Sequence, residues 1–178
     1  MTAEPIPAPC HKGEEAVHHG GPRPVTRWIA IHAEEGGTAR GAASWFANPL
    51  SHGSAHLSVD NKECWRSLPD EVIAYHAPPL NEEAWAVELA GWTAWKSATW
   101  FLHRRELNRA AYKVARRCKK YGIPGHFLTD ANLKAGHPGL VTHAQITRIW
   151  HRSTHTDPGL GFPARHFARR VRFYLAQL

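Results

Sequence analysis

The sequence predicts a single α/β (mixed α+β) domain. Short apolar segments typical of buried strands alternate along the chain with longer segments that have the period of amphipathic helices. The length of 178 residues fits one domain. Hydrophobic residues make up 43% of the chain, which suffices for a packed core and argues against global disorder.

Residues 1–24 differ in composition from the rest of the chain. They contain five prolines and the pair Gly20-Gly21, with little apolar periodicity. Such a composition is typical of extended chain or of a linker between domains. We therefore divide the chain into a flexible arm or linker remnant at 1–24 and a folded domain at 25–178.

The first predicted strand covers residues 26–32. Its sequence, TRWIAIH, is apolar and β-branched enough for a buried strand. A short helix is predicted over 39–47, because the pair Asn48-Pro49 disfavours a further helical turn.

A hairpin and another core strand follow. Residues 54–60 (SAHLSVD) alternate in polarity, and Asn61-Lys62 forms a turn after which residues 63–68 return as the partner strand. Residues 84–89 (AWAVEL) form a further strand of the core.

The clearest helix is predicted over 97–121. Its apolar residues recur at spacings of three and four, and its opposite face is basic. The apolar positions are Trp100, Leu107, Ala111, Val114, Cys118 and Tyr121. Gly122 and Pro124 end this helix.

Two more helices are predicted near the C-terminus. Thr142 and Gln145 have the spacing of a capping box, so a helix begins at His143. The last helix follows Pro163 and has an apolar face. That face consists of Phe167, Val171, Tyr174 and Leu178.

The chain is basic, with 22 Lys and Arg against 15 Asp and Glu and a formal net charge of +7. Such a surplus favours association with polyanions, which include nucleic acid, anionic membranes and the anionic polymers of a bacterial wall. The charge alone does not choose among these partners.

The three cysteines, Cys10, Cys64 and Cys118, are far apart and form no CxxC pair. This spacing indicates neither a disulfide framework nor a thiolate zinc site, and it favours a reducing site of synthesis. The first residues lack the basic and apolar regions of a secretory signal, and no apolar stretch has the length of a transmembrane span.

Two histidines and an aspartate lie at the ends of predicted elements. His32 ends the first strand, His143 begins a helix, and Asp157 lies in the turn HTDPG before the last helix. Two imidazoles and a carboxylate from separate elements suit a catalytic Zn²⁺ that keeps its fourth position for water. Zinc lowers the pKa of such a water to about 7.

The order of short motifs along the chain resembles that of the type-2 N-acetylmuramoyl-L-alanine amidases, which share a fold with the peptidoglycan recognition proteins. The finest resemblance is to the endolysin amidase modules of mycobacteriophages. The motifs, in order, are IHAEEG, SAHLSVDN, AYHA, AVELAG, KKYGIP, VTH and HTDPG followed by GFP.

The resemblance implies a fold and a set of site residues. It implies a central mixed sheet flanked by helices, with zinc in a cleft on one face. His32, His143 and Asp157 match the zinc ligands of the family. Glu88 matches its acidic residue that orients or deprotonates the zinc-bound water, and His155 matches the position that stabilises the oxyanion. His56 and His76 match positions of the pocket wall that do not bind the metal, where they would either contact substrate or pack within the wall.

The implied reaction is hydrolysis of the amide that joins the lactyl group of N-acetylmuramic acid to L-Ala in peptidoglycan. We expect a role in phage lysis, with synthesis in the host cytoplasm and release through a membrane pore made by another protein. We further expect a monomer that binds no nucleic acid and does not insert into membranes, and the Pro-rich start suggests that it was cut from a longer, modular lysin.

Several alternatives stay open. Asp157 has a simple structural interpretation as a turn residue that caps the next helix, in which case the chain would be a recognition module without catalysis. The positive charge and the many histidines also suit a metal-dependent nucleic-acid-processing protein. A zinc peptidase acting elsewhere in the stem peptide is a third alternative. Ala33-Glu34-Glu35 also departs from the family, where a His or Thr often follows the first ligand.

Overall fold

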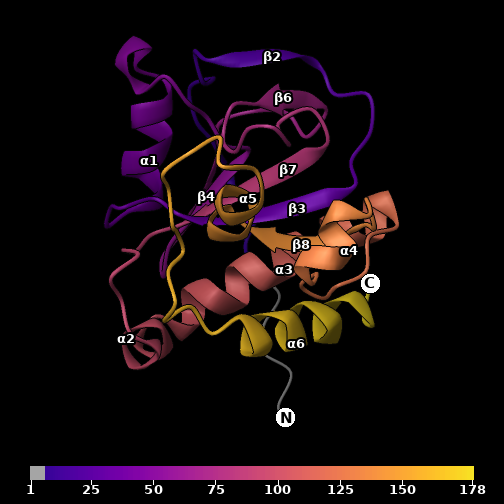
Figure 1. Cartoon of the computed structure of the whole chain (residues 1–178). Helices are drawn as coiled ribbons and strands as arrows, with labels where there is room; N and C mark the ends of the chain where they lie inside the picture. Colours follow the sequence, from indigo (N-terminus) through magenta and orange to yellow (C-terminus); the bar gives the residue numbers. More distant parts are fainter. Residues whose placement is uncertain (1–6) are drawn as a thin grey trace.

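A six-stranded mixed sheet with the order β1-β5-β4-β7-β3-β8 forms the centre of the protein (Figure 1). The computed structural model describes residues 7–178. β3, β4, β7 and β8 are parallel, whereas β5 runs antiparallel to β4. The strands are His11–Lys12 (β1), Trp28–Ala33 (β3), Leu57–Val59 (β4), Cys64–Arg66 (β5), Ala84–Leu89 (β7) and Gly139–Thr142 (β8).

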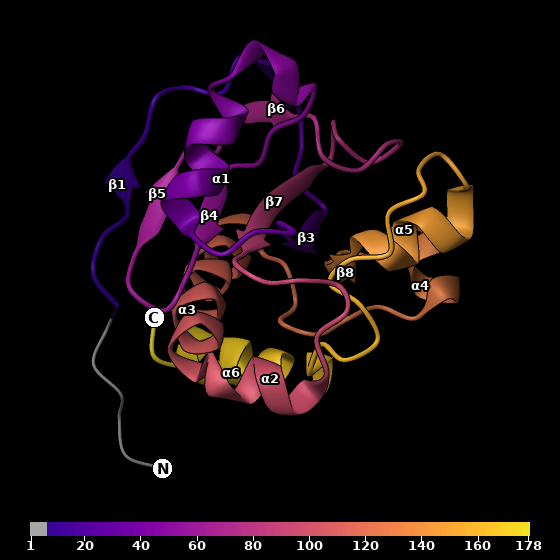
Figure 2. The same ribbon diagram turned by 90° about the vertical axis from the view of Figure 1, so that its left-hand side faces the viewer.

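Helices cover both faces of this sheet, which confirms the predicted fold class. α3 and α6 pack together below the sheet, while α1 and α5 lie over its other face (Figures 1 and 2). The helices are Ala39–Phe46 (α1), Ser97–Leu102 (α2), Arg104–Tyr121 (α3), Asp130–Lys134 (α4), His143–Trp150 (α5) and Ala164–Leu175 (α6), with a 3-10 turn at Pro49–Ser51 (η1). Among the described residues, no helix has both the length and the apolar character needed to cross a bilayer.

The central strand β3 is buried on both sides. Ile29 and Ile31 belong to the core cluster that includes α3 and α6, whereas Trp28 and Ala30 pack with Ile146 of α5 on the other face. Because successive side chains alternate between the faces of a strand, the next residue on the α5 side is His32. The pattern of the strand thus directs a polar side chain toward the helices α1 and α5.

The predicted helix over 97–121 is divided in two at His103, whose φ of −97° and ψ of 31° are not helical. A tertiary contact explains the break. Asn61 contacts the ring of His103 (Nδ2–Nδ1 2.9 Å) and accepts a hydrogen bond from the backbone N–H of Glu106 at 3.1 Å. The side chain of Asn61 therefore satisfies an amide at the start of α3 that a continuous helix would have satisfied itself.

The described part of the predicted arm, residues 7–24, contributes strands to the fold. β1 pairs in parallel with β5, and β2 (His19–Pro22) pairs antiparallel with β6 (Val72–Ala74) in a second, two-stranded sheet. Between these strands the side chain of Ala16 is buried. Residues 1–6 lie outside the described residues, and the division at residue 24 stays a prediction.

The expectation that the cysteines form no disulfide is wrong, because Cys10 and Cys64 are bonded to each other. The pairing of β1 with β5 places His11 opposite Trp65, so the residues just before them, Cys10 and Cys64, are neighbours with a Cα–Cα distance of 4.6 Å. A parallel pairing between segments 54 residues apart leaves no local signal in the sequence. Cys118 is a free, buried thiol, as its place on the apolar face of α3 predicted.

We expect the variant Cys10→Ser to be less stable than the native protein by about 2–4 kcal/mol, because the bond closes a loop of 54 residues that is open in the unfolded variant. Denaturant unfolding with and without a reductant measures this. The reductant should destabilise the native protein and Cys118→Ser equally, and should leave Cys10→Ser unchanged. Equal sensitivity of all three proteins would contradict the assignment.

One carboxyl group lies inside the core between α3 and the β4–β5 turn. Glu106 is fully buried, and neither of its oxygens has a hydrogen-bond partner among the described residues. Burial raises the pKa of this carboxyl to about 10, with a further contribution from Glu34 and Asp60. The nearest cationic candidate is Nδ1 of His103 at 3.5 Å.

This raised pKa predicts that Glu106→Gln stabilises the protein. The carboxyl of Glu106 loses its proton near pH 4.5 in the unfolded chain and near pH 10 in the folded protein. Native stability therefore falls as the pH rises between these values. The gain in the variant should therefore grow with pH over this range and reach about 2–3 kcal/mol at pH 7. Thermal unfolding from pH 4 to 9 measures it, with the exposed Glu14→Gln as control. A gain that does not depend on pH would contradict the explanation.

Candidate active site

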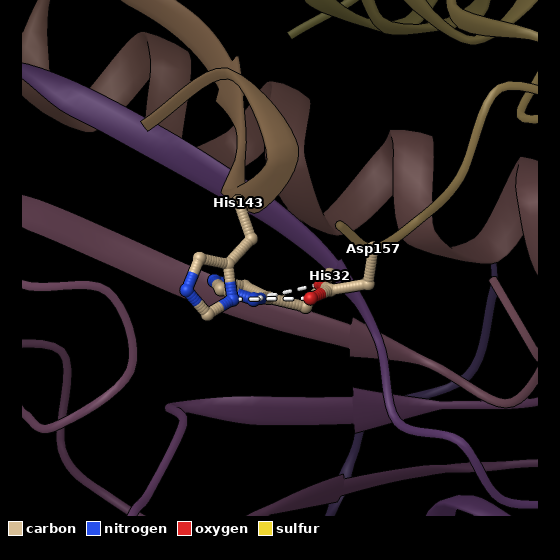
Figure 3. Close-up of side chains that lie close together, drawn as sticks. All are labelled: His32, His143 and Asp157. Atoms are coloured by element: carbon tan, nitrogen blue, oxygen red, sulfur yellow. Dashed lines mark hydrogen bonds and ion pairs between the residues drawn. The ribbon is translucent and has the colours of Figure 1, made fainter. Parts of the chain in front are cut away.

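Three side chains from separate elements meet on the α5 side of the sheet (Figure 3). His32 lies near the C-terminal end of β3, His143 is the first residue of α5, and Asp157 lies in the loop that leads to α6. The side chain of Thr142 accepts a hydrogen bond from the N–H of Gln145, as the predicted capping box requires, so α5 begins at His143. The backbone N–H of Ala144 donates to the carbonyl of Asp157 (2.8 Å), which holds the loop against the helix.

The donor atoms of this group fit a metal ion. Nδ1 of His32 and Nδ1 of His143 each lie 3.1 Å from a carboxylate oxygen of Asp157, and all three side chains are buried. Their ligand atoms lie within 4.8 Å of one another. Zinc bonds of about 2.0–2.1 Å in a tetrahedron place neighbouring ligand atoms about 3.3 Å apart, so the three donors need little movement to share an ion.

Two of these groups also have the charge state that metal binding requires. Burial lowers the pKa of His32 and keeps its imidazole neutral. Burial acts to raise the pKa of Asp157, but the hydrogen bonds with His143 and His32 outweigh it and hold that pKa well below its usual range. A neutral imidazole and an ionised carboxylate are the forms that bind metal ions.

His76 orients the ring of His32. When Nδ1 of a neutral His32 binds a metal, the proton is on Nε2, and Nδ1 of His76 accepts it at 3.0 Å. His76 then carries its own proton on Nε2, 3.4 Å from the carbonyl of Ala84. Hydrogen bonds of this kind fix the tautomer of a ligand histidine. Burial, followed by the nearby His32, keeps the pKa of His76 well below its ordinary value, which agrees with a neutral ring.

Glu88 lies beside the group formed by His32, His143 and Asp157. It occupies β7 in register with His32 on β3, and it lines the same pocket. The side chain is buried, and Oε2 has no hydrogen-bond partner among the described residues. Burial raises the pKa of this carboxyl well above its ordinary value, and the charges of Asp157 and Glu34 add to the effect. A raised pKa suits a group that exchanges protons near neutral pH.

His155 lies at the mouth of the site. Its ring stacks on that of His143 at a centroid distance of 4.9 Å, and its Nδ1 is 3.9 Å from Asp157. The side chain is 68% exposed. The ring of His155 therefore lies next to His143 and Asp157 and is accessible to a bound molecule, while its role in catalysis stays a prediction.

A pocket of about 1170 Å³ opens over these residues between α1 and the loop after α5. Its wall includes residues for which the sequence analysis assigned no role, namely Glu34, Tyr75, Asn81 and Arg152, and it also includes Trp45, which is exposed there.

Burial raises the pKa of Glu34 to about 8, with a smaller contribution from Asp60. Asn81 accepts hydrogen bonds from the backbone N–H groups of His76 and Ala77 and so holds the His76 loop. The position of Glu34 two residues after His32 is the signal that could have identified it.

His56 does not line this pocket, in contrast to the expectation from its motif. Its ring is fully buried and stacks on Trp85 at 5.5 Å. Nδ1 accepts a hydrogen bond from the N–H of Ala86, and Nε2 lies 2.9 Å from the carbonyl of Val72. Burial, followed by the charge of Arg23, lowers its pKa to about 3. His56 therefore joins β7 to β6 and does not face substrate.

A buried His-His-Asp group, with a carboxylic acid of raised pKa beside it in an open pocket, defines a candidate metal-dependent hydrolase. The comparison with known families gives the particular class. A sequence model of the N-acetylmuramoyl-L-alanine amidase family matches residues 21–160. The chain belongs to this family and is an amidase. No curated protein matches the sequence.

Solved structures share the fold. The hydrolase AmiA of Staphylococcus aureus, solved with its ligand, is 17% identical with a TM-score of 0.73, and the match covers 96% of this chain and 85% of that one. The N-acetylmuramoyl-L-alanine amidase LysC of Clostridium intestinale is 14% identical with a TM-score of 0.62, covering 91% and 97%. A mutant endolysin from Bacillus subtilis is 17% identical with a TM-score of 0.58, covering 90% and 96%.

Proposed function

We propose that this amidase is zinc-dependent and hydrolyses the bond between the lactyl group of N-acetylmuramic acid and L-Ala of the peptidoglycan stem peptide. The observation that carries the proposal is the group of His32, His143 and Asp157, whose donor atoms lie within 4.8 Å of one another. Membership of the amidase family supports the choice of substrate bond.

The side chains of the pocket have distinct parts in this mechanism. His32, His143 and Asp157 would hold the zinc, which when bound supplies a Lewis acid for the scissile carbonyl and lowers the pKa of water. Glu88 accepts a proton from the attacking water and transfers it to the leaving amine of L-Ala. His155, exposed at the mouth of the site, donates a hydrogen bond to the tetrahedral oxygen. His76 keeps the ring of His32 in position through its hydrogen bond.

Chelation tests the proposal. Treatment with EDTA should reduce the cleavage of purified muropeptides by at least about 100-fold, because the group loses its Lewis acid, and added Zn²⁺ should restore it. New amino ends should be those of L-Ala, which mass spectrometry identifies. New amino ends at another residue would make the protein a stem-peptide peptidase. Binding to wall fragments without cleavage would favour a recognition module.

We further propose that the enzyme acts in phage-mediated lysis, after synthesis in the host cytoplasm and passage through a membrane pore. Structures of endolysins among those with the same fold support this proposal. The disulfide between Cys10 and Cys64 also agrees with a place of action outside the reducing cytoplasm. Expression in a bacterial host tests it: lysis should require co-expression of a pore-forming protein, and lysis without one would contradict the expected route.

A further inference from the structure

The two halves of the chain carry opposite charge. Residues 91–178 contain 16 Lys and Arg against three Asp and Glu, whereas residues 1–90 contain six against twelve. The three acids of the second half offset little of this charge at the surface. Glu106 is buried in the core, Asp157 is buried in the active site, and Asp130 forms an ion pair with Arg148 at 2.6 Å. The surface that the second half exposes is therefore strongly positive.

A groove of about 630 Å³ lies within this positive region, between α2 and α6. The two helices meet where the ring of Phe101 contacts that of His166, with a centroid distance of 5.1 Å. The groove is lined by residues of α2 and α6 and by Phe127. α6 lies below the sheet (Figure 1), whereas His32, His143 and Asp157 lie on the α5 side (Figure 3). A molecule in the groove can therefore be bound while substrate occupies the active site.

Three arginines of α6 line the groove. Arg165, Arg169 and Arg172 are exposed and repeat at spacings of four and three, so they share one side of α6. None of the three forms an ion pair with a carboxylate in the part of the chain that the structure describes. Arg169 contacts the ring of His166 at 3.2 Å, and Arg172 donates to the carbonyl of Gly125 at 3.2 Å. Neither partner is a carboxylate, so these bonds orient two guanidinium groups without an opposite charge on the atom they contact.

Two aromatic rings also line the groove. Phe101 lies on α2 and is 44% exposed. Phe127 is half-buried and is held in place by Phe162 and Phe167, at centroid distances of 6.3 and 6.4 Å. Fixed aromatic rings next to cationic side chains suit a ligand whose units combine an apolar ring face with a negative charge.

We propose that this groove binds an anionic glycan of the cell wall, with sugar rings on Phe101 and Phe127 and the acidic groups on Arg165, Arg169 and Arg172. The choice of the wall as the source rests on the proposed function, because polymers attached to the substrate are the polyanions that a wall amidase meets. Binding there would hold the enzyme on the wall between successive cleavage events.

The test measures binding of the full chain to polygalacturonate, with uncharged dextran, polyphosphate, duplex DNA and vesicles of phosphatidylglycerol and phosphatidylcholine as comparison ligands. The groove variant combines Arg165→Gln, Arg169→Gln and Arg172→Gln. The control variant removes the same charge from three exposed residues elsewhere, with Lys12→Gln, Lys62→Gln and Arg66→Gln. The groove variant should bind polygalacturonate about tenfold more weakly, and the control about twofold more weakly at most.

The variant Phe101→Ala keeps the positive charge of the groove and tests the contribution of its aromatic rings. It should weaken binding of polygalacturonate several-fold and leave that of polyphosphate unchanged. Equal losses in the groove and control variants would overturn the proposal, because net charge alone would then explain the binding. Tighter binding of DNA would overturn it too, as would vesicle binding that Leu102→Ser abolishes, since Leu102 is 81% exposed and lies outside the groove.

Catalysis provides an independent readout. The groove variant should cleave small soluble muropeptides at the native rate, because none of its three positions contacts the pocket over His32. Loss of glycan binding with intact cleavage would confirm that the groove acts separately. Glycan binding by a protein that cleaves no muropeptide would refute the proposed function and leave the groove assignment standing.

Discussion

Replacing His143 with alanine is expected to abolish both metal binding and amide hydrolysis. The variant keeps Asp157 and His32 but loses the donor that lies 3.1 Å from the carboxylate of Asp157. Two remaining ligands hold zinc weakly, since catalytic zinc sites use three protein ligands. We expect zinc content to fall from about one ion per chain to below about 0.1, and kcat/KM to fall by about 1,000-fold or more.

The matched control is His126→Ala, which removes an exposed histidine that does not line the pocket. It should keep native zinc content and activity. Metal analysis, muropeptide cleavage and circular dichroism on the three proteins separate loss of the site from loss of the fold. A folded His143→Ala protein that retains one zinc ion per chain would show that the ligand assignment is wrong.

The sequence locates His32 and His143 well because both lie at the ends of strongly patterned elements. The apolar run 26–32 ends in His32, and the spacing of Thr142 and Gln145 marks the start of a helix at His143. Both signals are local, and the structure confirms both elements. Local signals cannot predict that Asp157 lies next to the two histidines. That position depends on how the loop after α5 packs on Ala144.

The failures have the same origin in tertiary contacts. The family resemblance places His56 in the pocket wall, but the packing of Trp85 and the carbonyl of Val72 enclose its ring. The disulfide depends on a parallel pairing of β1 with β5. The break at His103 depends on the side chain of Asn61, which lies in the distant β4–β5 turn. In each case the deciding partner is at least 16 residues away along the chain.

Glu88→Gln is expected to lower kcat by about 100- to 10,000-fold, the usual contribution of a general base, while zinc content stays at the native level. Glutamine has nearly the same shape as glutamate but cannot accept the proton of the attacking water. The register of Glu88 with His32 places the carboxyl next to the metal-binding group without making it one of the three ligands. Retention of zinc with loss of turnover therefore separates this variant from His143→Ala. The exposed Glu82→Gln serves as the control and should behave as native.

The same substitution should stabilise the metal-free protein, which a merely structural role would not predict. Burial raises the pKa of Glu88, so the folded state disfavours the ionised carboxyl, and native stability falls as the pH rises above the pKa of the unfolded chain near 4.5. Glutamine removes this penalty, so the gain in Tm should increase with pH. A variant that is less stable and still active would show that Glu88 supports the sheet and takes no part in catalysis. A variant that is more stable and inactive would show that the fold tolerates an unfavourable buried acid because the reaction needs it.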